Sequence, residues 1–181
     1  MSVAEKNKFT KTDYQLLEEG APFQLIDGEL IISPTPYHQL LSKRIFKVID
    51  AFLEKHHIEG TFLYAPLDIY LDNENVFQPD LVYISGQLES ELVKDRISVA
   101  PDLIIEILSP STAYYDLRQK KDFYERYGVK EYLIIDPLSK SAEVYILKNE
   151  EFTLYQKEQQ NGTINLNTLP GLQIDLQKLF S

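Results

Sequence analysis

Residues 102–108 of this sequence, DLIIEIL, place apolar side chains on both faces of a β-strand and interrupt them with only two acids, Asp102 and Glu106. Strands that are apolar on both faces occupy the middle of a sheet that is covered from both sides. An ionised carboxylate inside such a strand is costly unless it is paired, hydrogen-bonded or bound to a metal. The fold must therefore supply a layer on each face of this strand and a partner for Glu106.

The segments around this strand alternate between helix and strand. A long helix is predicted at 37–57, because apolar residues recur at i, i+4, i+7 and i+11 from Leu41. Hairpins are expected at 23–33, around Asp27-Gly28, and at 142–156. The other expected segments are a short helix at 10–20, strands at 61–71, 79–84 and 131–136, a second long helix at 115–127, and an irregular stretch at 85–100.

This order of helix, three strands, helix and strand predicts one mixed α/β (α+β) domain over residues 1–181. Its centre would be a mixed β-sheet flanked by helices, with extra β-hairpins at the edges. The chain contains no cysteine, which excludes a disulfide scaffold, a cysteine-ligated zinc site and a thiol nucleophile.

Neither end of the chain nor its middle predicts a membrane protein. Residues 1–14 are polar and lack the apolar core of a signal peptide. No apolar stretch approaches the roughly 20 residues needed to span a bilayer. We therefore expect a cytoplasmic protein.

The net charge of −10 bears on possible partners. A protein that coats nucleic acid without regard to sequence should be basic, because lysine and arginine neutralise the phosphates. The charge argues against that class. It leaves open an enzyme that uses carboxylates and a divalent metal on phosphates, since a bound metal reverses the local field.

Asp80 is the best partner for Glu106 at a metal site. It opens the strand predicted before that of Glu106, so the two acids can meet at one end of the sheet. Asp102 lies four residues from Glu106 on the same strand, about 13 Å away at 3.3 Å per residue, which is too far to share an ion. Carboxylate oxygens suit a divalent cation and phosphoryl chemistry.

The helix predicted at 115–127 can bring a cation to these acids. Asp116, Lys120 and Tyr124 are spaced by four and lie on one helical face. A lysine there could orient an attacking water or stabilise the charge that develops on a phosphate. Lys121 would point about 100° away.

Several motifs resemble one widespread bacterial family, often called the Uma family, of the PD-(D/E)xK nuclease superfamily. The resemblance runs from Asp27-Gly28-Glu29 to Leu169-Pro170-Gly171, and its most specific part is central. The central motifs are Pro79-Asp80, residues 101–112, Asp116-x3-Lys120-x3-Tyr124, residues 128–132 and Ile135-Asp136-Pro137. It implies a restriction-endonuclease-like core, a nucleic acid substrate with DNA the first expectation, and a homodimer.

The resemblance also implies roles for particular residues. Asp80 and Glu106 would bind Mg²⁺ or Mn²⁺. The usual motif has its lysine two residues after the acid, but Leu108 stands there, so the catalytic lysine maps to Lys120 on the next helix. By the same resemblance, Glu29 and His38 line the site.

Each of these residues also has a structural interpretation. Glu106 could pair with a lysine only to hold the fold, Asp80 could cap a turn, and Lys120 could be solvated. Glu29 could be an exposed hairpin residue, His38 a helix cap, and Tyr124 a packed aromatic. For the whole protein, the alternative to a metal-dependent nuclease is a catalytically degenerate dimer that keeps the nuclease fold as a binding module.

Overall fold

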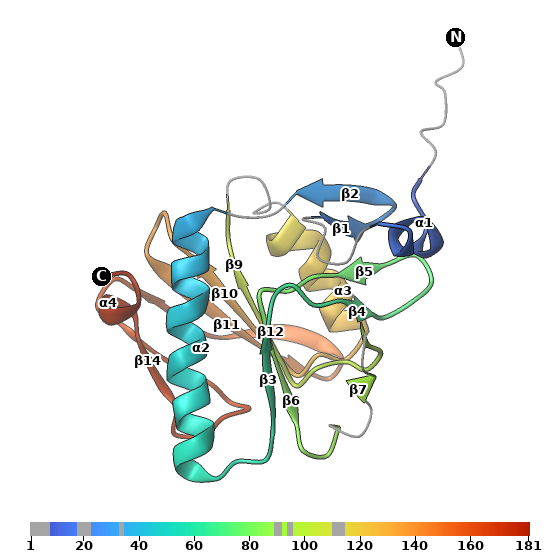
Figure 1. The fold of residues 1–181 in the computed structure, drawn as a ribbon. Helices are drawn as coiled ribbons and strands as arrows, with labels where there is room; N and C mark the ends of the chain where they lie inside the picture. The colour runs from blue at the N-terminus through green and yellow to red at the C-terminus, as the bar shows by residue number, and fades with distance from the viewer. Residues whose placement is uncertain (1–7, 18–22, 33–34, 89–91, 94–95, 110–114) are drawn as a thin grey trace.

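The computed structural model describes residues 8–17, 23–32, 35–88, 92–93, 96–109 and 115–181 (Figure 1). The helices are α1 (Lys11–Gln15), α2 (Pro36–His56), the π-helix η2 (Tyr115–Lys120), α3 (Lys121–Arg126) and α4 (Leu176–Leu179). The strands are β1 (Phe23–Ile26), β2 (Glu29–Ile32), β3 (Gly60–Tyr64), β4 (Ile69–Tyr70), β5 (Val76–Phe77), β6 (Leu81–Ser85), β7 (Leu92–Val93), β8 (Arg96–Ile97), β9 (Leu103–Ile107), β10 (Glu131–Asp136), β11 (Ser141–Lys148), β12 (Glu151–Gln159), β13 (Thr163–Asn165) and β14 (Gln173–Asp175).

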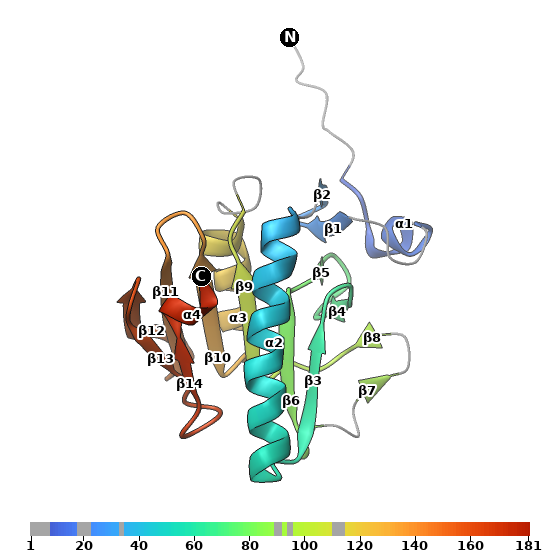
Figure 2. The same ribbon diagram turned by 60° about the vertical axis from the view of Figure 1, so that its left-hand side comes forward.

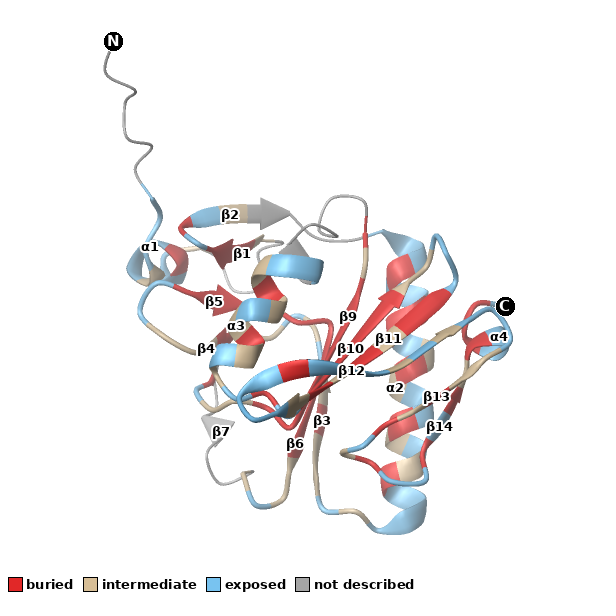
Figure 3. Ribbon diagram, turned by 180° about the vertical axis from the view of Figure 1, so that it is seen from behind, coloured by how far each residue is buried: buried red, intermediate tan, exposed pale blue. Residues whose placement is uncertain are grey.

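The central sheet has six strands in the order β12-β11-β10-β9-β6-β3. Strand β9 pairs parallel with β10 and antiparallel with β6, so the sheet is mixed, as expected. All five residues of β9 are buried, which confirms that residues 102–108 form a central strand. Figure 3 shows this buried centre in red between strands and helices that are exposed on their outer sides.

Helix α2 covers one face of the central sheet, and the continuous η2–α3 helix lies on the opposite face (Figures 1 and 2). Side chains of β9 alternate between the two cores. Ile105 packs in the cluster that contains Leu41 of α2, and Ile104 packs in the cluster that contains Tyr124 of α3. By this alternation Glu106 faces the η2–α3 helix.

A second sheet, in the order β2-β1-β5-β4-β8-β7, lies beside the η2–α3 helix. Its hairpin between β1 and β2 turns at Asp27 and Gly28, where φ is 47° and 76°. Two positive φ values are typical of the tight hairpin turn that Asp-Gly predicts. On its other side β1 pairs antiparallel with β5, with Leu25 opposite Val76.

Four segments differ from expectation. Residues 61–71 form two strands in different sheets, because Pro66 between them has no N–H to donate to a ladder. The stretch at 85–100, expected to be irregular, contains the two-residue strands β7 and β8. The helix at 115–127 begins as a π-helix, and of the helix expected at 10–20 only α1 is present, with residues 18–20 outside the described part.

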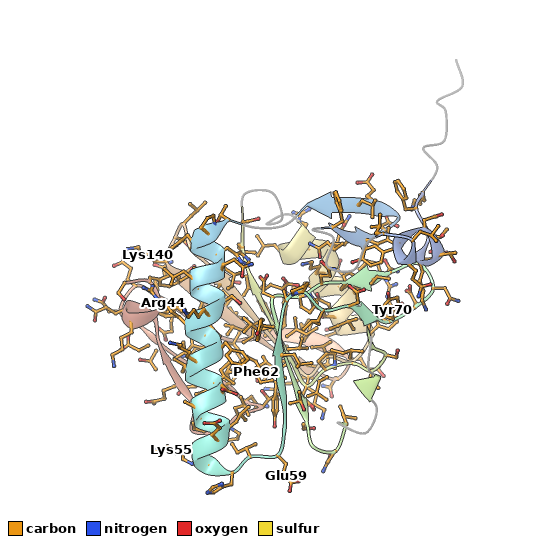
Figure 4. All side chains as sticks on the ribbon, in the orientation of Figure 1. Arg44, Lys55, Glu59, Phe62, Tyr70 and Lys140 are labelled. Atoms are coloured by element: carbon orange, nitrogen blue, oxygen red, sulfur yellow. The ribbon has the colours of Figure 1, made fainter. Side chains whose placement is uncertain are left out.

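Hydrogen bonds from α2 and to β10 hold the C-terminal segment against the core. Arg44 of α2, labelled in Figure 4, donates from Nη1 to the main-chain oxygen of Leu179 at 2.8 Å. Glu131, fully buried at the start of β10, accepts the N–H groups of Asn167 and Thr168 at 2.7 and 2.8 Å and the hydroxyl of Thr168 at 2.5 Å. No helix in the described ranges is long and apolar enough to cross a membrane.

Replacing Glu131 with alanine should lower the free energy of unfolding by about 2 kcal/mol, because three donors lose their acceptor at a buried site. Urea unfolding followed by circular dichroism measures this change. Glu54→Ala, on the exposed side of α2, is the matched control and should change the free energy by less than about 0.5 kcal/mol. Equal stabilities of the two variants would show that Glu131 does not fasten the C-terminal segment.

Candidate active site

Asp80 lies immediately before β6, at the same end of the sheet as Glu106. The antiparallel pairing of Leu81 with Ile105 brings the next residues, Asp80 and Glu106, to neighbouring positions. Asp80 Oδ2 accepts the main-chain N–H of Ile107 at 2.7 Å. This bond ties the Asp80 carboxylate to the strand that carries Glu106, and the two acids occupy opposing positions of neighbouring strands.

His38 reaches Asp80 from the first turn of α2. Thr35 caps this helix, with its hydroxyl 3.4 Å from the N–H of His38. His38 Nε2 lies 3.0 Å from Asp80 Oδ2, and the side chain is almost fully buried. Because a carboxylate oxygen only accepts, Nε2 carries the proton in this contact, and the Nδ1 atom of a neutral ring is then an acceptor.

Glu106 receives two donors from the helix on the other face. Lys120 Nζ and the Tyr124 hydroxyl lie 2.8 and 2.9 Å from the same oxygen, Oε1. Glu106 and Lys120 are 2% and 1% exposed, and Tyr124 is not exposed at all. Lys120 ends the π-helical turn and Tyr124 follows one α-helical turn later. The lysine is therefore not solvated but paired inside the protein.

Glu29 lies further out than the other four predicted residues. It starts β2 opposite Ile26 and is exposed. The hydrogen bond that Lys8 donates to Asp27 raises the pKa of the Lys8 ammonium, and the charge of Glu29 adds a smaller contribution of the same sign. Glu29 therefore lies on the hairpin near the solvent-exposed Lys8. Its role in the site stays a prediction.

Asp102, the rival acid, belongs to the opposite end of β9. It accepts hydrogen bonds from Lys130 Nζ and from the N–H of Ser85, the latter at 2.7 Å. Burial would raise the pKa of its carboxyl, but these hydrogen bonds outweigh burial and hold that pKa below its ordinary value. Lys121 points away from Glu106, with Nζ 3.7 Å from the centre of the Tyr145 ring.

The donor set at this end of the sheet fits a hard divalent cation that keeps part of its water. Within the described ranges, no three histidine, aspartate or glutamate side chains gather as a ready metal site. Mg²⁺ typically binds proteins through one or two carboxylates and fills its octahedral shell with water and substrate oxygens. The neighbouring carboxylates of Asp80 and Glu106 match that pattern better than a site made wholly of protein ligands.

The contact of Tyr124 with Glu106 is the part of the site that sequence reasoning missed. Its spacing of four from Lys120 was visible, but a tyrosine on an apolar helical face is equally well a core residue. The ring does pack in the core, edge-on to Phe77 and Tyr132 with centroids 5.4 and 5.3 Å away. Only the direction of the hydroxyl separates the two interpretations. The side chain of Asp116 lies outside the described part of the chain.

A mixed sheet between helices, with two acids on neighbouring strands and a buried lysine on the next helix, defines a restriction-endonuclease-like protein. The sequence matches the Uma2 family, described as "Putative restriction endonuclease", over residues 11–177. This match covers nearly the whole chain, so the protein belongs to that family.

The chain is also similar to two other proteins. A solved structure from Anabaena variabilis, titled "a putative nuclease belonging to DUF820", superposes with a TM-score of 0.76 at 20% identity, over 95% of this chain and 97% of the other. At that identity the likeness shows the fold. An uncharacterized protein of Synechocystis is 26% identical over 151 residues, which are 80% of this chain and 84% of the relative.

The buried ion pair predicts strong coupling between Glu106 and Lys120. Removing one partner leaves a buried charge uncompensated, so Glu106→Gln and Lys120→Met should each lower the free energy of unfolding by about 3 kcal/mol. The double variant should lose at least about 2 kcal/mol less than the sum of the two. Denaturant unfolding of the four proteins completes this cycle.

Lys121→Met is the control for this cycle, since it removes the adjacent lysine, which contacts Tyr145 instead. It should show no coupling to Glu106→Gln. Additive effects of the Glu106 and Lys120 substitutions would mean that the pair does not stabilise the fold as a unit.

Proposed function

We propose that this protein is a metal-dependent nuclease that hydrolyses phosphodiester bonds, with DNA as the first substrate to test. The observation that carries the proposal is the meeting of Asp80, Glu106 and Lys120 at one end of the central sheet, in a chain of the Uma2 family. A nucleic acid substrate also suits the cytoplasmic address that we expect.

Asp80 and Glu106, with the main-chain oxygen of Ile107, would hold Mg²⁺ or Mn²⁺. Bound there, the cation would polarise the phosphate and lower the pKa of an attacking water. His38 would orient Asp80 through its Nε2–H. Glu29 would line the outer side of the site, from the hairpin between β1 and β2.

Lys120 would serve the reaction by a change of partner. It now contacts Glu106 Oε1, at a distance where its charge compensates that carboxylate. A cation bound by Glu106 would take over part of this compensation. The ammonium could then orient the attacking water or stabilise the charge on the phosphate. Lys121 cannot replace it, because its side chain lies on the Tyr145 ring.

Two observations favour the alternative, a catalytically degenerate binding module. The net charge is −10, and the lysine is displaced from the usual motif to the next helix. The buried Glu106–Lys120 pair would then serve stability alone. A module of this kind would bind neither a divalent cation nor nucleic acid at low salt.

Cleavage of plasmid and single-stranded DNA or RNA in Mn²⁺ tests the proposal. Glu106→Gln, which keeps the shape of the side chain, and Lys120→Met should each lower the rate by about 100-fold or more, the usual effect of removing one electrostatic contact to the transition state. Circular dichroism checks that both variants are folded. Wild-type rates in Glu106→Gln would falsify the metal site.

Asp102→Asn and Lys121→Met are the matched controls for this assay. They remove a second buried acid of the same strand and the neighbouring lysine of the same helix, both outside the site. Each should keep the wild-type rate. Equal losses in the controls and the site variants would point to a general effect on folding.

We further propose that the protein forms a homodimer through the edge strand β3. The other edge strand, β12, carries charged residues, and its pairing with β11 shifts register between Val144 and Tyr145; both features discourage edge pairing. Strand β3 (GTFLY) has no charge and no proline. Phe62 lies between β3 and α2 (Figure 4), stacked on Phe46, while Tyr64 is 61% exposed.

Antiparallel pairing of two β3 strands about Phe62 would place Tyr64 opposite Gly60 of the second copy, which has no side chain of its own. Tyr64→Lys should therefore convert the dimer into a monomer, because two like charges would flank the paired edges. Sedimentation velocity measures the mass. Leu154→Lys, an exposed apolar residue on the other edge, should leave the dimer intact.

A further inference from the structure

Two buried polar side chains each carry one atom that has no hydrogen-bond partner among the described residues, although His38 contacts Asp80 through its other ring nitrogen. Gln24 is 4% exposed and His38 is 5% exposed. In the described part of the chain, no protein group lies within hydrogen-bond distance of Gln24 Oε1 or His38 Nδ1. The third such atom, Oε1 of Gln119, belongs to a side chain on η2 that is less buried. Buried polar groups without partners are uncommon, and each calls for a physical reason.

The alternation of side chains along β1 places Gln24 on the face of the second sheet that packs toward Tyr124. Ile26, two residues along β1, packs in the cluster that contains Tyr124, whereas Leu25 faces the other side of the sheet. Gln24 shares the face of Ile26, since side chains of a strand alternate. Figures 1 and 3 show β1 beside the first turns of the η2–α3 helix, the part that carries Lys120.

The pairing of β1 with β5 relates the position of Gln24 to the positions of both acids. With Leu25 opposite Val76, Gln24 stands opposite Phe77, three residues before Asp80. The Phe77 ring packs edge-on against Tyr124, whose hydroxyl donates to Glu106. His38 of α2 contacts Asp80 through Nε2.

The chemistry of these atoms matches the water shell of a cation. A water bound to Mg²⁺ or Mn²⁺ points its oxygen at the metal and can only donate hydrogen bonds outward. Such a shell needs acceptors that no protein donor has already taken. Gln24 Oε1 is such an acceptor.

We propose that Gln24 is a metal-positioning residue, whose side-chain oxygen accepts a hydrogen bond from a water bound to the active-site cation. This inference rests on the proposed metal site and adds a residue from the second sheet, outside the motifs of the central one. It explains why a polar side chain is kept in a buried position of β1.

Calorimetric titration of Mn²⁺ into the metal-free protein tests the inference, with thermal unfolding of each metal-free variant as a second measurement. Gln24→Leu should weaken Mn²⁺ binding by about 10-fold, which is the usual effect of losing a hydrogen bond to a group that binds the metal. Its melting temperature should not fall, because a buried polar group without a partner is replaced by an apolar one. Gln24→Glu, a stronger acceptor, should bind Mn²⁺ at least as tightly as the wild type.

Gln39→Leu, an exposed glutamine of α2, is the control and should bind as the wild type does. Wild-type affinity in Gln24→Leu would overturn the inference. A lower melting temperature together with weaker binding in both Gln24 variants would overturn it as well, since Gln24 would then be structural or a donor. Glu106→Gln separates the two proposals: if it binds Mn²⁺ as the wild type does, the metal site itself fails.

Discussion

The ion pair between Glu106 and Lys120 joins the central strand to the helix that covers it, with both partners almost wholly buried. A carboxylate in the middle of a sheet would be very costly alone, and a lysine in the core equally so. Each charge compensates the other, and the Tyr124 hydroxyl donates a second hydrogen bond to the same oxygen. The position of η2–α3 on the sheet, and with it one wall of the site, depends on this contact.

The acids at the two ends of β9 have different surroundings. At one end Asp102 pairs with Lys130 and the N–H of Ser85, and its lowered pKa agrees with a charge held for structure. At the other end Glu106 stands beside a second acid, Asp80, which has its own histidine. Glu106 is compensated by Lys120, whereas Asp80 is held by the histidine and the N–H of Ile107.

The second sheet gives the site a wall that the central sheet alone lacks. Its strand β1 packs Ile26 into the cluster that contains Tyr124, and the buried amide of Gln24 shares that face of the strand. Its hairpin carries Glu29 at the outer rim. A chain with a net charge of −10 can approach nucleic acid only if the repulsion is offset locally. A cation between Asp80 and Glu106 would do so where the chemistry takes place.

The order of the core elements, the Asp-Gly hairpin and the burial of Glu106 could all be predicted from the sequence, because hydrophobic period and turn chemistry are local properties. The Uma family and its acids were recognisable for the same reason, as residues at set spacings in one stretch of chain. The split of residues 61–71 between two sheets was not, since the choice between sheets is made by distant strands. Nor could spacing show that the Tyr124 hydroxyl points at Glu106, or that Gln24 lies across from Phe77. Those contacts join residues far apart in the chain, and only the packed tertiary structure decides them.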